Sequence, residues 1–312
     1  MSVSQSQTTA EQATLASRGA QIAERSAVMR RRHLRHLFSN SIFTAIVVVI
    51  GLLWSVPTFG LFVSSFRPGN LIKTTGWWTG LVPPWSFTIE NYQQVLAARG
   101  LGQAFLNSLI ISIPGTLFPL ALGAIAAYAF AWMRFPGRDY IFLGIVALLV
   151  IPSQIALVPI LTVFTQMGIT GQYIAVWLAH TAFGLPFAIY LLRNFFAALP
   201  SDLIESAQID GASHWLMFSR IILPLSLSSL ASLAIFQFMW VWNDLLVSLI
   251  FLGGNPQRAP MTLTVANLIG SYGQNYEVLT AAAFISMALP LIVFFSLQRY
   301  FVRGVLAGSV KG

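Results

Sequence analysis

Few side chains in this sequence are suited to chemistry. The chain has no cysteine, four histidines and two lysines among its 312 residues. The histidines do not have the spacing of a His-Glu-x-x-His zinc site. Neither Lys73 nor Lys311 follows a glycine, which excludes a glycine-lysine phosphate loop. The sequence therefore predicts no catalytic, cofactor or metal site, and any ATP hydrolysis that drives the protein must take place in another polypeptide.

One acidic residue, Asp244, lies inside an apolar run, directly after Asn243 and close to Trp240. Placing an ionisable group at the centre of a bilayer costs at least about 2.5 kcal/mol, so such residues are candidates for a solute path. A position near the membrane interface, or a helix-capping role, explains the same carboxylate equally well. His180 also lies in an apolar run, where a lone histidine is more often a packing residue than a proton relay.

The composition requires a membrane. Hydrophobic residues make up 56% of the chain and charged residues 8%, with a mean hydropathy of +0.75. Soluble proteins carry about 25% charged residues, so an ordinary soluble enzyme and a disordered chain are both excluded. A helix that crosses a bilayer needs about 20 apolar residues. The gaps between charges predict six crossings: 42–66, 103–132, two within 140–192 separated by a glycine turn at 167–172, 221–252 and 278–298.

The second crossing carries a face of small residues that suits close helix packing. That face consists of Gly123, Ala124, Ala126, Ala127 and Ala129. We expect another helix to pack against it.

The basic residues orient these crossings. With both termini in the cytoplasm, thirteen of the 17 Lys and Arg residues fall on the inner side and four on the outer side. Because inner loops are enriched in Lys and Arg, this orientation is favoured. The basic cluster at 30–32 is then a topology anchor and not a nucleic-acid patch. The sequence predicts an all-α integral membrane protein with a cytoplasmic tail at 1–40 and a six-helix domain at 41–312.

One segment that is predicted to be cytoplasmic, residues 199–224, contains clear signals for where helices start and end. Pro200 is a helix-start signal, Gly211 a stop signal, and Ser213 a cap for a second helix. Leu203 and Ala207 are four residues apart and share a face, which predicts a short amphipathic helix with an apolar edge. Such a helix needs a surface to dock against.

This segment resembles the "EAA" loop of the permease subunits of binding-protein-dependent ABC importers, proteins of the MetI-like fold. The resemblance rests on Glu205-Ser206-Ala207, then Gly211, then Ile221 and Leu223-Pro224 at the family spacing; the family has Ala where this chain has Ser206. It implies a coupling helix that inserts into a cleft of a nucleotide-binding subunit. It further implies roles for eight residues: Glu205, Ser206, Ala207, Asp210, Gly211, Ile221, Leu223 and Pro224. Among them, Glu205 offers a charged contact, Ala207 permits close approach and Gly211 makes the turn.

Further segments resemble the permeases of carbohydrate importers, and the resemblance extends over residues 41–312. These segments are 87–92, 135–138, 242–244 and 298–302, while 64–68 and 76–78 are similar to α-glucoside permeases. The resemblance implies a maltose-type second permease in a bacterial or archaeal inner membrane. Its partners would be a related permease in a heterodimer, two ATPase subunits that bind ATP and Mg²⁺, a solute-binding protein, a sugar and membrane lipid.

The same resemblance implies that an outer turn contacts the solute-binding protein and helps to displace the sugar. The turn consists of Gly253, Gly254, Asn255 and Pro256. A plain surface connection is the alternative, because a polar, glycine-rich loop needs no special role.

Three other functions remain open from the residues. A permease for peptides or polyamines shares the coupling loop. An ion-coupled secondary transporter needs several paired ionisable groups inside the membrane, and the sequence offers one peripheral aspartate. An intramembrane enzyme needs a nucleophile and base, or metal ligands, at membrane depth. Ahead of these functions, we expect that of a permease of a sugar importer.

Overall fold

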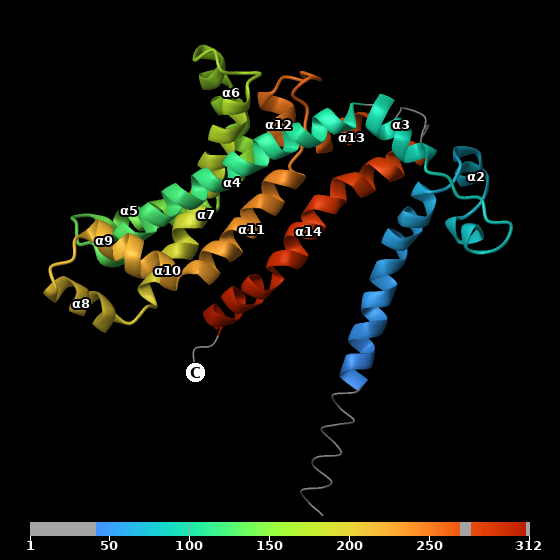
Figure 1. Ribbon diagram of the computed structural model, residues 1–312. Coiled ribbons are helices and arrows are strands. Elements are labelled where there is room, and N and C mark those ends of the chain that lie inside the picture. The colour runs from blue at the N-terminus through green and yellow to red at the C-terminus, as the bar shows by residue number, and fades with distance from the viewer. Residues whose placement is uncertain (1–41, 99, 269–275, 310–312) are drawn as a thin grey trace, which may run out of the picture. The chain divides into compact units, whose positions relative to one another are not determined.

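The computed structural model describes residues 42–98, 100–268 and 276–309, and within these residues every regular element is a helix (Figure 1). The chain separates into two compact units, Met1–Leu61 and Phe62–Gly312, which are described in turn. The described part of the first unit belongs to one apolar helix, Ile42–Ser65, long enough to cross a membrane. The basic tail at 1–40 and the terminal residues 310–312 lie outside the described residues.

Two buried polar side chains, Arg67 and Asn91, stabilise the segment that follows the first helix through hydrogen bonds. Arg67 is 2% exposed and donates hydrogen bonds to the Gly76 carbonyl and to the hydroxyls of Thr75 and Thr79. Asn91 donates to the carbonyls of Ser65 and Arg67. The connection between the first two predicted crossings is therefore folded and contains three short helices: α2 (Gly69–Thr74), the 3₁₀-helix Trp77–Leu81 and α3 (Glu90–Ala98).

Four long helices form the main body of the second unit: α4 (Leu101–Trp132), α7 (Tyr173–Ala197), α11 (Leu227–Asn243) and α14 (Tyr276–Ser309). The α4 helix packs most extensively against α7, and α11 packs against both α4 and α14. Gly123 lies directly against Ala188 of α7: a Cβ added at Gly123 would be 2.7 Å from the Ala188 Cβ. The predicted packing of the small-residue face is thus confirmed.

Two of the predicted crossings are bent pairs of helices. The first pair, α5 (Arg138–Leu148) and α6 (Ser153–Gln166), bends by 99° just before Pro152. Proline disfavours helical geometry in the residue before it, which accounts for the break. The second pair joins His214–Leu225 to α11 and bends by 76°. Within the described residues there are four full-length candidate spans, and six if each bent pair crosses once, in agreement with the predicted number.

The glycine turn expected at 167–172 is confirmed. Helix α6 ends at Gln166, α7 begins at Tyr173, and both Gly168 and Gly171 have positive φ angles of 70° and 82°. Figure 1 shows two short helices, α12 (Leu246–Phe251) and α13 (Met261–Leu268), near one end of α11. The opposite end of α11 lies nearer to α8 (Ser201–Ile209) and α9 (His214–Met217). The predicted coupling residues at 205–224 therefore lie near one end of α11. The predicted path and turn residues at 240–256 lie near the other end.

Candidate functional site

Helix α8 (Ser201–Ile209) forms where the start signal at Pro200 and the stop signal at Gly211 predict it. It starts directly after Pro200 and ends in a Schellman motif, with Gly211 at a φ of 78°. The Ala212 N–H donates to the Ala207 carbonyl at 2.9 Å, and the Gly211 N–H donates to the Gln208 carbonyl at 3.0 Å. A residue with a Cβ strains this left-handed position, so glycine fixes the turn.

One face of α8 is buried against the helix bundle. Ile204 is 2% exposed and Ala207 packs against the same apolar cluster, whereas Leu203 is 45% exposed. The helix docks onto its own bundle through the i, i+3 pair Ile204 and Ala207, and Leu203 on the predicted apolar edge stays exposed. Glu205, Ser206 and Asp210 lie on the exposed side.

A continuous packed segment connects α8 to the long helices. Ser213 caps α9 (His214–Met217) by accepting a hydrogen bond from the Leu216 N–H at 3.3 Å, as predicted. The π-helical turn Phe218–Ile222 and α10 (Leu223–Leu225) follow. Ile221 and Leu223 pack against the apolar cluster, while Pro224 is exposed.

Helix α4 contacts this segment directly. The Tyr128 hydroxyl lies 3.0 Å from His214 Nδ1, and the Tyr128 ring packs on Phe218 with centroids 5.4 Å apart. These two contacts join α9 and the π-helical turn to α4. Residues 201–225, the predicted coupling segment, have an exposed polar face on one side and contact the helix bundle on the other.

At the opposite end of α11, Asp244 caps the start of the next helix. Its Oδ2 accepts a hydrogen bond from the Val247 N–H at 2.9 Å, and its backbone carbonyl accepts one from Thr262 Oγ1 at 2.8 Å. Asn243 is exposed and donates to the Met239 carbonyl at 2.7 Å. Trp240, Asn243 and Asp244, the residues predicted to line a solute path, are close together in the sequence. The two hydrogen bonds of Asp244 give it a structural role as well, at the start of α12.

His180 lies next to both Trp240 and Asp244. The Trp240 ring lies edge-on to the imidazole, with centroids 5.4 Å apart. His180 Nε2 is 3.9 Å from Asp244 Oδ2, which is longer than a hydrogen bond. Neither ring nitrogen of His180 has a hydrogen-bond partner among the described residues. The site is a buried polar junction between α7, α11 and α12.

The turn that includes Gly253, Gly254, Asn255 and Pro256 has an exposed tip and a fixed base. Both glycines have positive φ angles, of 62° and 73°, and the Asn255 side chain accepts a hydrogen bond from the Gln257 N–H at 3.0 Å. The rest of this outer loop includes residues 269–275, which lie outside the described residues.

Buried Asn107 of α4 anchors the base of this turn, although sequence reasoning missed it. Its side chain donates to the carbonyls of Gln257 at 2.9 Å and Ala259 at 3.0 Å, and it accepts from the Tyr173 hydroxyl at 2.8 Å. The Arg258 guanidinium donates to the carbonyl of Gly171 and lies over the Tyr173 ring. The sequence does contain a signal for this role. Asn107 lies inside a predicted crossing, where a buried side-chain amide needs hydrogen-bond partners.

Residues 119–307 of this chain, which include the coupling segment, match the family described as "Binding-protein-dependent transport system inner membrane component". The chain belongs to this family. The family resemblance inferred from residues 205–224 is thereby confirmed. It is a family of transport-system membrane components, not of enzymes, and its members work in systems that depend on a binding protein.

Two relatives are similar over most of the chain. The osmoprotective compounds uptake permease protein GgtD of Synechocystis sp. is 55% identical over 268 residues, which cover 85% of this chain and 90% of the relative. The alpha-glucoside transport system permease protein AglG of Rhizobium meliloti is 54% identical over 239 residues, which cover 75% of this chain and 63% of the relative.

A solved structure has the same fold. It is a bacterial ABC transporter involved in the import of the acidic polysaccharide alginate, with a TM-score of 0.73 at 19% identity. The superposition covers 84% of this permease and 98% of the solved chain. The all-α membrane fold predicted from the sequence is confirmed.

Proposed function

We propose that this permease forms half of the translocation path of an ATP-driven sugar importer and couples it to a separate ATPase through residues 199–224. The observation that carries the proposal is the coupling segment, which exposes Glu205, Ser206 and Asp210 on one side. On its other side it packs onto α4 and continues into α11. A push on the exposed face therefore acts on two helices of the bundle.

The mechanism is alternating access. A second, related permease completes the path, and two ATPase subunits bind ATP and Mg²⁺ outside this chain. ATP-driven closure of these subunits draws the coupling segments together and opens the path outward, and hydrolysis resets it inward. A solute-binding protein docks on the outer side, where the turn at 253–256 contacts it. Trp240, Asn243 and Asp244 lie beside the path.

A sugar with an α-glucosidic bond is the proposed solute. The support is the 54% identity to the alpha-glucoside permease AglG, together with the similarity of residues 64–68 and 76–78 to that class. The 55% identity to GgtD favours osmoprotective compounds as a second candidate. The two candidates differ in when uptake is needed, since osmoprotection follows salt stress.

The first experiment tests coupling in cells that express the full importer. Gly211→Val places a β-branched side chain at a φ of 78°, and Glu205→Ala removes the exposed charge. We expect both variants to insert normally and to lose uptake by about tenfold or more, with ATP hydrolysis no longer stimulated by solute-loaded binding protein. Asp139→Ala removes an exposed acid outside the segment and should keep both activities. Full uptake by well-expressed Gly211→Val cells would contradict the assignment.

A second experiment identifies the energy source and the solute. Deleting the ATPase subunit should abolish uptake of labelled trehalose, whereas dissipating the proton gradient at constant ATP should leave it intact. The reverse pattern indicates a secondary transporter. Trehalose uptake that is equal with and without salt supports a nutrient sugar importer; uptake of non-glucoside solutes such as glycine betaine under salt stress alone supports the osmoprotectant alternative.

A further inference from the structure

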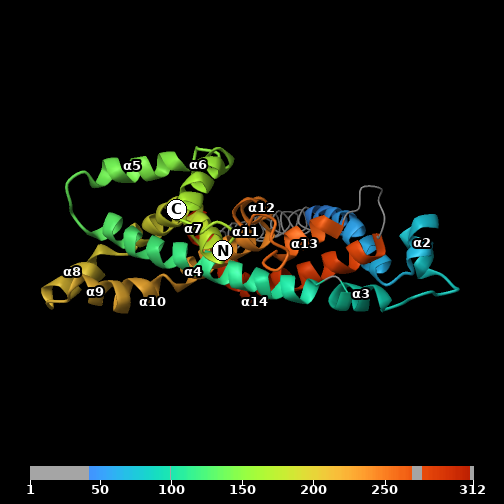
Figure 2. The same cartoon turned by 90° about the horizontal axis from the view of Figure 1, so that it is seen from above.

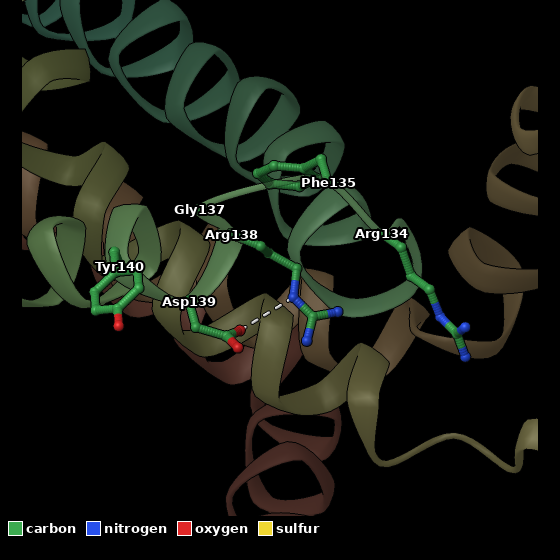
Figure 3. A pocket seen from close by; sticks show the side chains of 6 residues that line it. All are labelled: Arg134, Phe135, Gly137, Arg138, Asp139 and Tyr140. Atoms are coloured by element: carbon green, nitrogen blue, oxygen red, sulfur yellow. Dashed lines mark hydrogen bonds and ion pairs between the residues drawn. The ribbon is translucent and has the colours of Figure 1, made fainter.

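The corner between α4 and α5 forms a cavity of about 320 Å³ that is open to the surface (Figure 3). This volume is near the lower end of the roughly 300–1,000 Å³ range of small-molecule sites. Two arginines and one aspartate give its wall a net positive charge. The lining residues are Arg134, Phe135, Gly137, Arg138, Asp139 and Tyr140.

The hydrogen-bond donors in this cavity exceed the acceptors. Arg138 Nε is paired with Asp139 Oδ1 at 3.1 Å, and its Nη1 reaches the Met133 carbonyl at 3.4 Å (Figure 3). The exposed Arg134 guanidinium has no ion pair or hydrogen bond to any part of the chain that the structure describes. One complete guanidinium fork is therefore free to bind an anion.

The backbone adds to this positive character. Helix α5 starts at Arg138 directly after Gly137, whose φ is 77°, and no side chain within the described residues caps this end. The first N–H groups of a helix carry a partial positive charge and favour a negatively charged partner. The uncapped helix end and the two arginines together give this corner a positive character.

The surroundings of the cavity distinguish a lipid from a free ion. The candidate span Leu101–Trp132 ends just before Arg134, so the cavity lies where a long apolar helix leaves the hydrocarbon. On α5 the adjacent side chains are apolar and open: Ile141 is 51% and Leu143 65% exposed, and Tyr140 is 83% exposed. Such a flank suits acyl chains and a headgroup-level aromatic ring.

We propose that the α4–α5 corner binds the phosphate of an anionic phospholipid, with Arg134 and Arg138 as its ligands and the exposed side of α5 against its acyl chains. Inorganic phosphate has the same anionic chemistry but cannot use the apolar flank. This site is separate from the coupling segment, and it stands whether or not the transported solute is a sugar.

Native mass spectrometry of the detergent-purified full importer tests this site. Phosphatidylglycerol, phosphatidylcholine and inorganic phosphate are each titrated into the wild type and into Arg134→Gln, Arg138→Gln and the double variant. We expect the wild type to prefer phosphatidylglycerol, and each substitution to weaken its binding about fivefold without affecting phosphatidylcholine. Lys73→Gln removes an exposed positive charge outside the cavity and should keep the preference.

Two results would overturn the proposal. One is a double variant that binds phosphatidylglycerol as tightly as the wild type. The other is displacement of phosphatidylglycerol by equimolar inorganic phosphate, which assigns the cavity to the free ion. If Arg134→Gln gives too little protein, Arg134→Lys replaces it: a lysine keeps the charge without the planar fork, so binding should fall two- to threefold. Unchanged phosphatidylglycerol binding by Arg134→Lys would also contradict the site.

Discussion

Asp244 shows how one carboxylate supports two functional interpretations. Its oxygen accepts a hydrogen bond from the Val247 N–H, which satisfies one of the free donors at the start of α12. The same oxygen lies 3.9 Å from His180 Nε2, at the buried junction beside Trp240. The capping bond needs only an acceptor, whereas a role in attracting solute needs the negative charge.

Substitution of Asp244 separates these two roles. Asparagine keeps a carbonyl acceptor in the same place, so Asp244→Asn should keep stability and uptake close to wild type. Alanine removes the acceptor, and we expect Asp244→Ala to lower the free energy of unfolding by about 1 kcal/mol. Thermal unfolding in detergent and uptake in cells measure the two effects. A loss of uptake in Asp244→Asn equal to that in Asp244→Ala, with stability retained, would show that the charge itself is required.

At the level of elements, the close approach of α4 and α7 depends on the absence of a side chain. A Cβ at Gly123 would lie 2.7 Å from the Ala188 Cβ, a separation that atoms in real structures do not adopt. The helices would have to move apart around Tyr128 and Leu192, which belong to the same buried cluster as Ala188. That cluster also includes Ile204 of α8, so the contact supports the coupling segment as well.

A matched pair of glycine substitutions tests this packing. Gly123→Ala should lower the free energy of unfolding by about 1–3 kcal/mol, the usual cost of overpacking. Gly144→Ala in α5 has nothing within 4 Å of the added Cβ among the described residues. It should be neutral or stabilising by up to about 1 kcal/mol, because alanine is the better helix former. Thermal melts followed by tryptophan fluorescence compare them; an equal melting temperature for both variants would argue against the close contact.

For the whole molecule, the two candidate regions lie at opposite ends of α11. Figure 1 shows α8, α9 and α10 at one end of this helix and α12 at the other, and Figure 2 shows the same arrangement from above. A coupling segment that meets an ATPase and a turn that meets a binding protein must face opposite sides of the membrane. The excess of Lys and Arg predicts that the coupling segment is cytoplasmic.

Cysteine labelling tests this orientation cleanly, because the chain has no cysteine of its own. Ser206→Cys and Gln257→Cys place single thiols at exposed positions of α8 and of the outer turn. We expect a membrane-impermeant maleimide to label Gln257→Cys in spheroplasts, and Ser206→Cys only after the membrane is permeabilised. Labelling of both positions in intact spheroplasts, or the reverse pattern, would contradict the predicted topology.

The sequence alone determined the features that depend on neighbouring residues. Apolar run length and charge position fixed the number of crossings, since a bilayer of set thickness requires them. Pro200, Gly211 and Ser213 fixed the limits of α8 and the start of α9, because caps and positive φ angles are local properties. The spacing of residues 205–224 indicated the family for the same reason.

Only the tertiary structure decided which side chains meet. Helical periodicity placed both Leu203 and Ile204 close to Ala207, and only packing against the bundle selected Ile204 as buried. The pairing of Tyr128 with His214 spans 86 positions, and that of Asn107 with Ala259 spans 152. No local pattern encodes such pairs, because each depends on how separate helices pack and on which buried polar groups then need a partner.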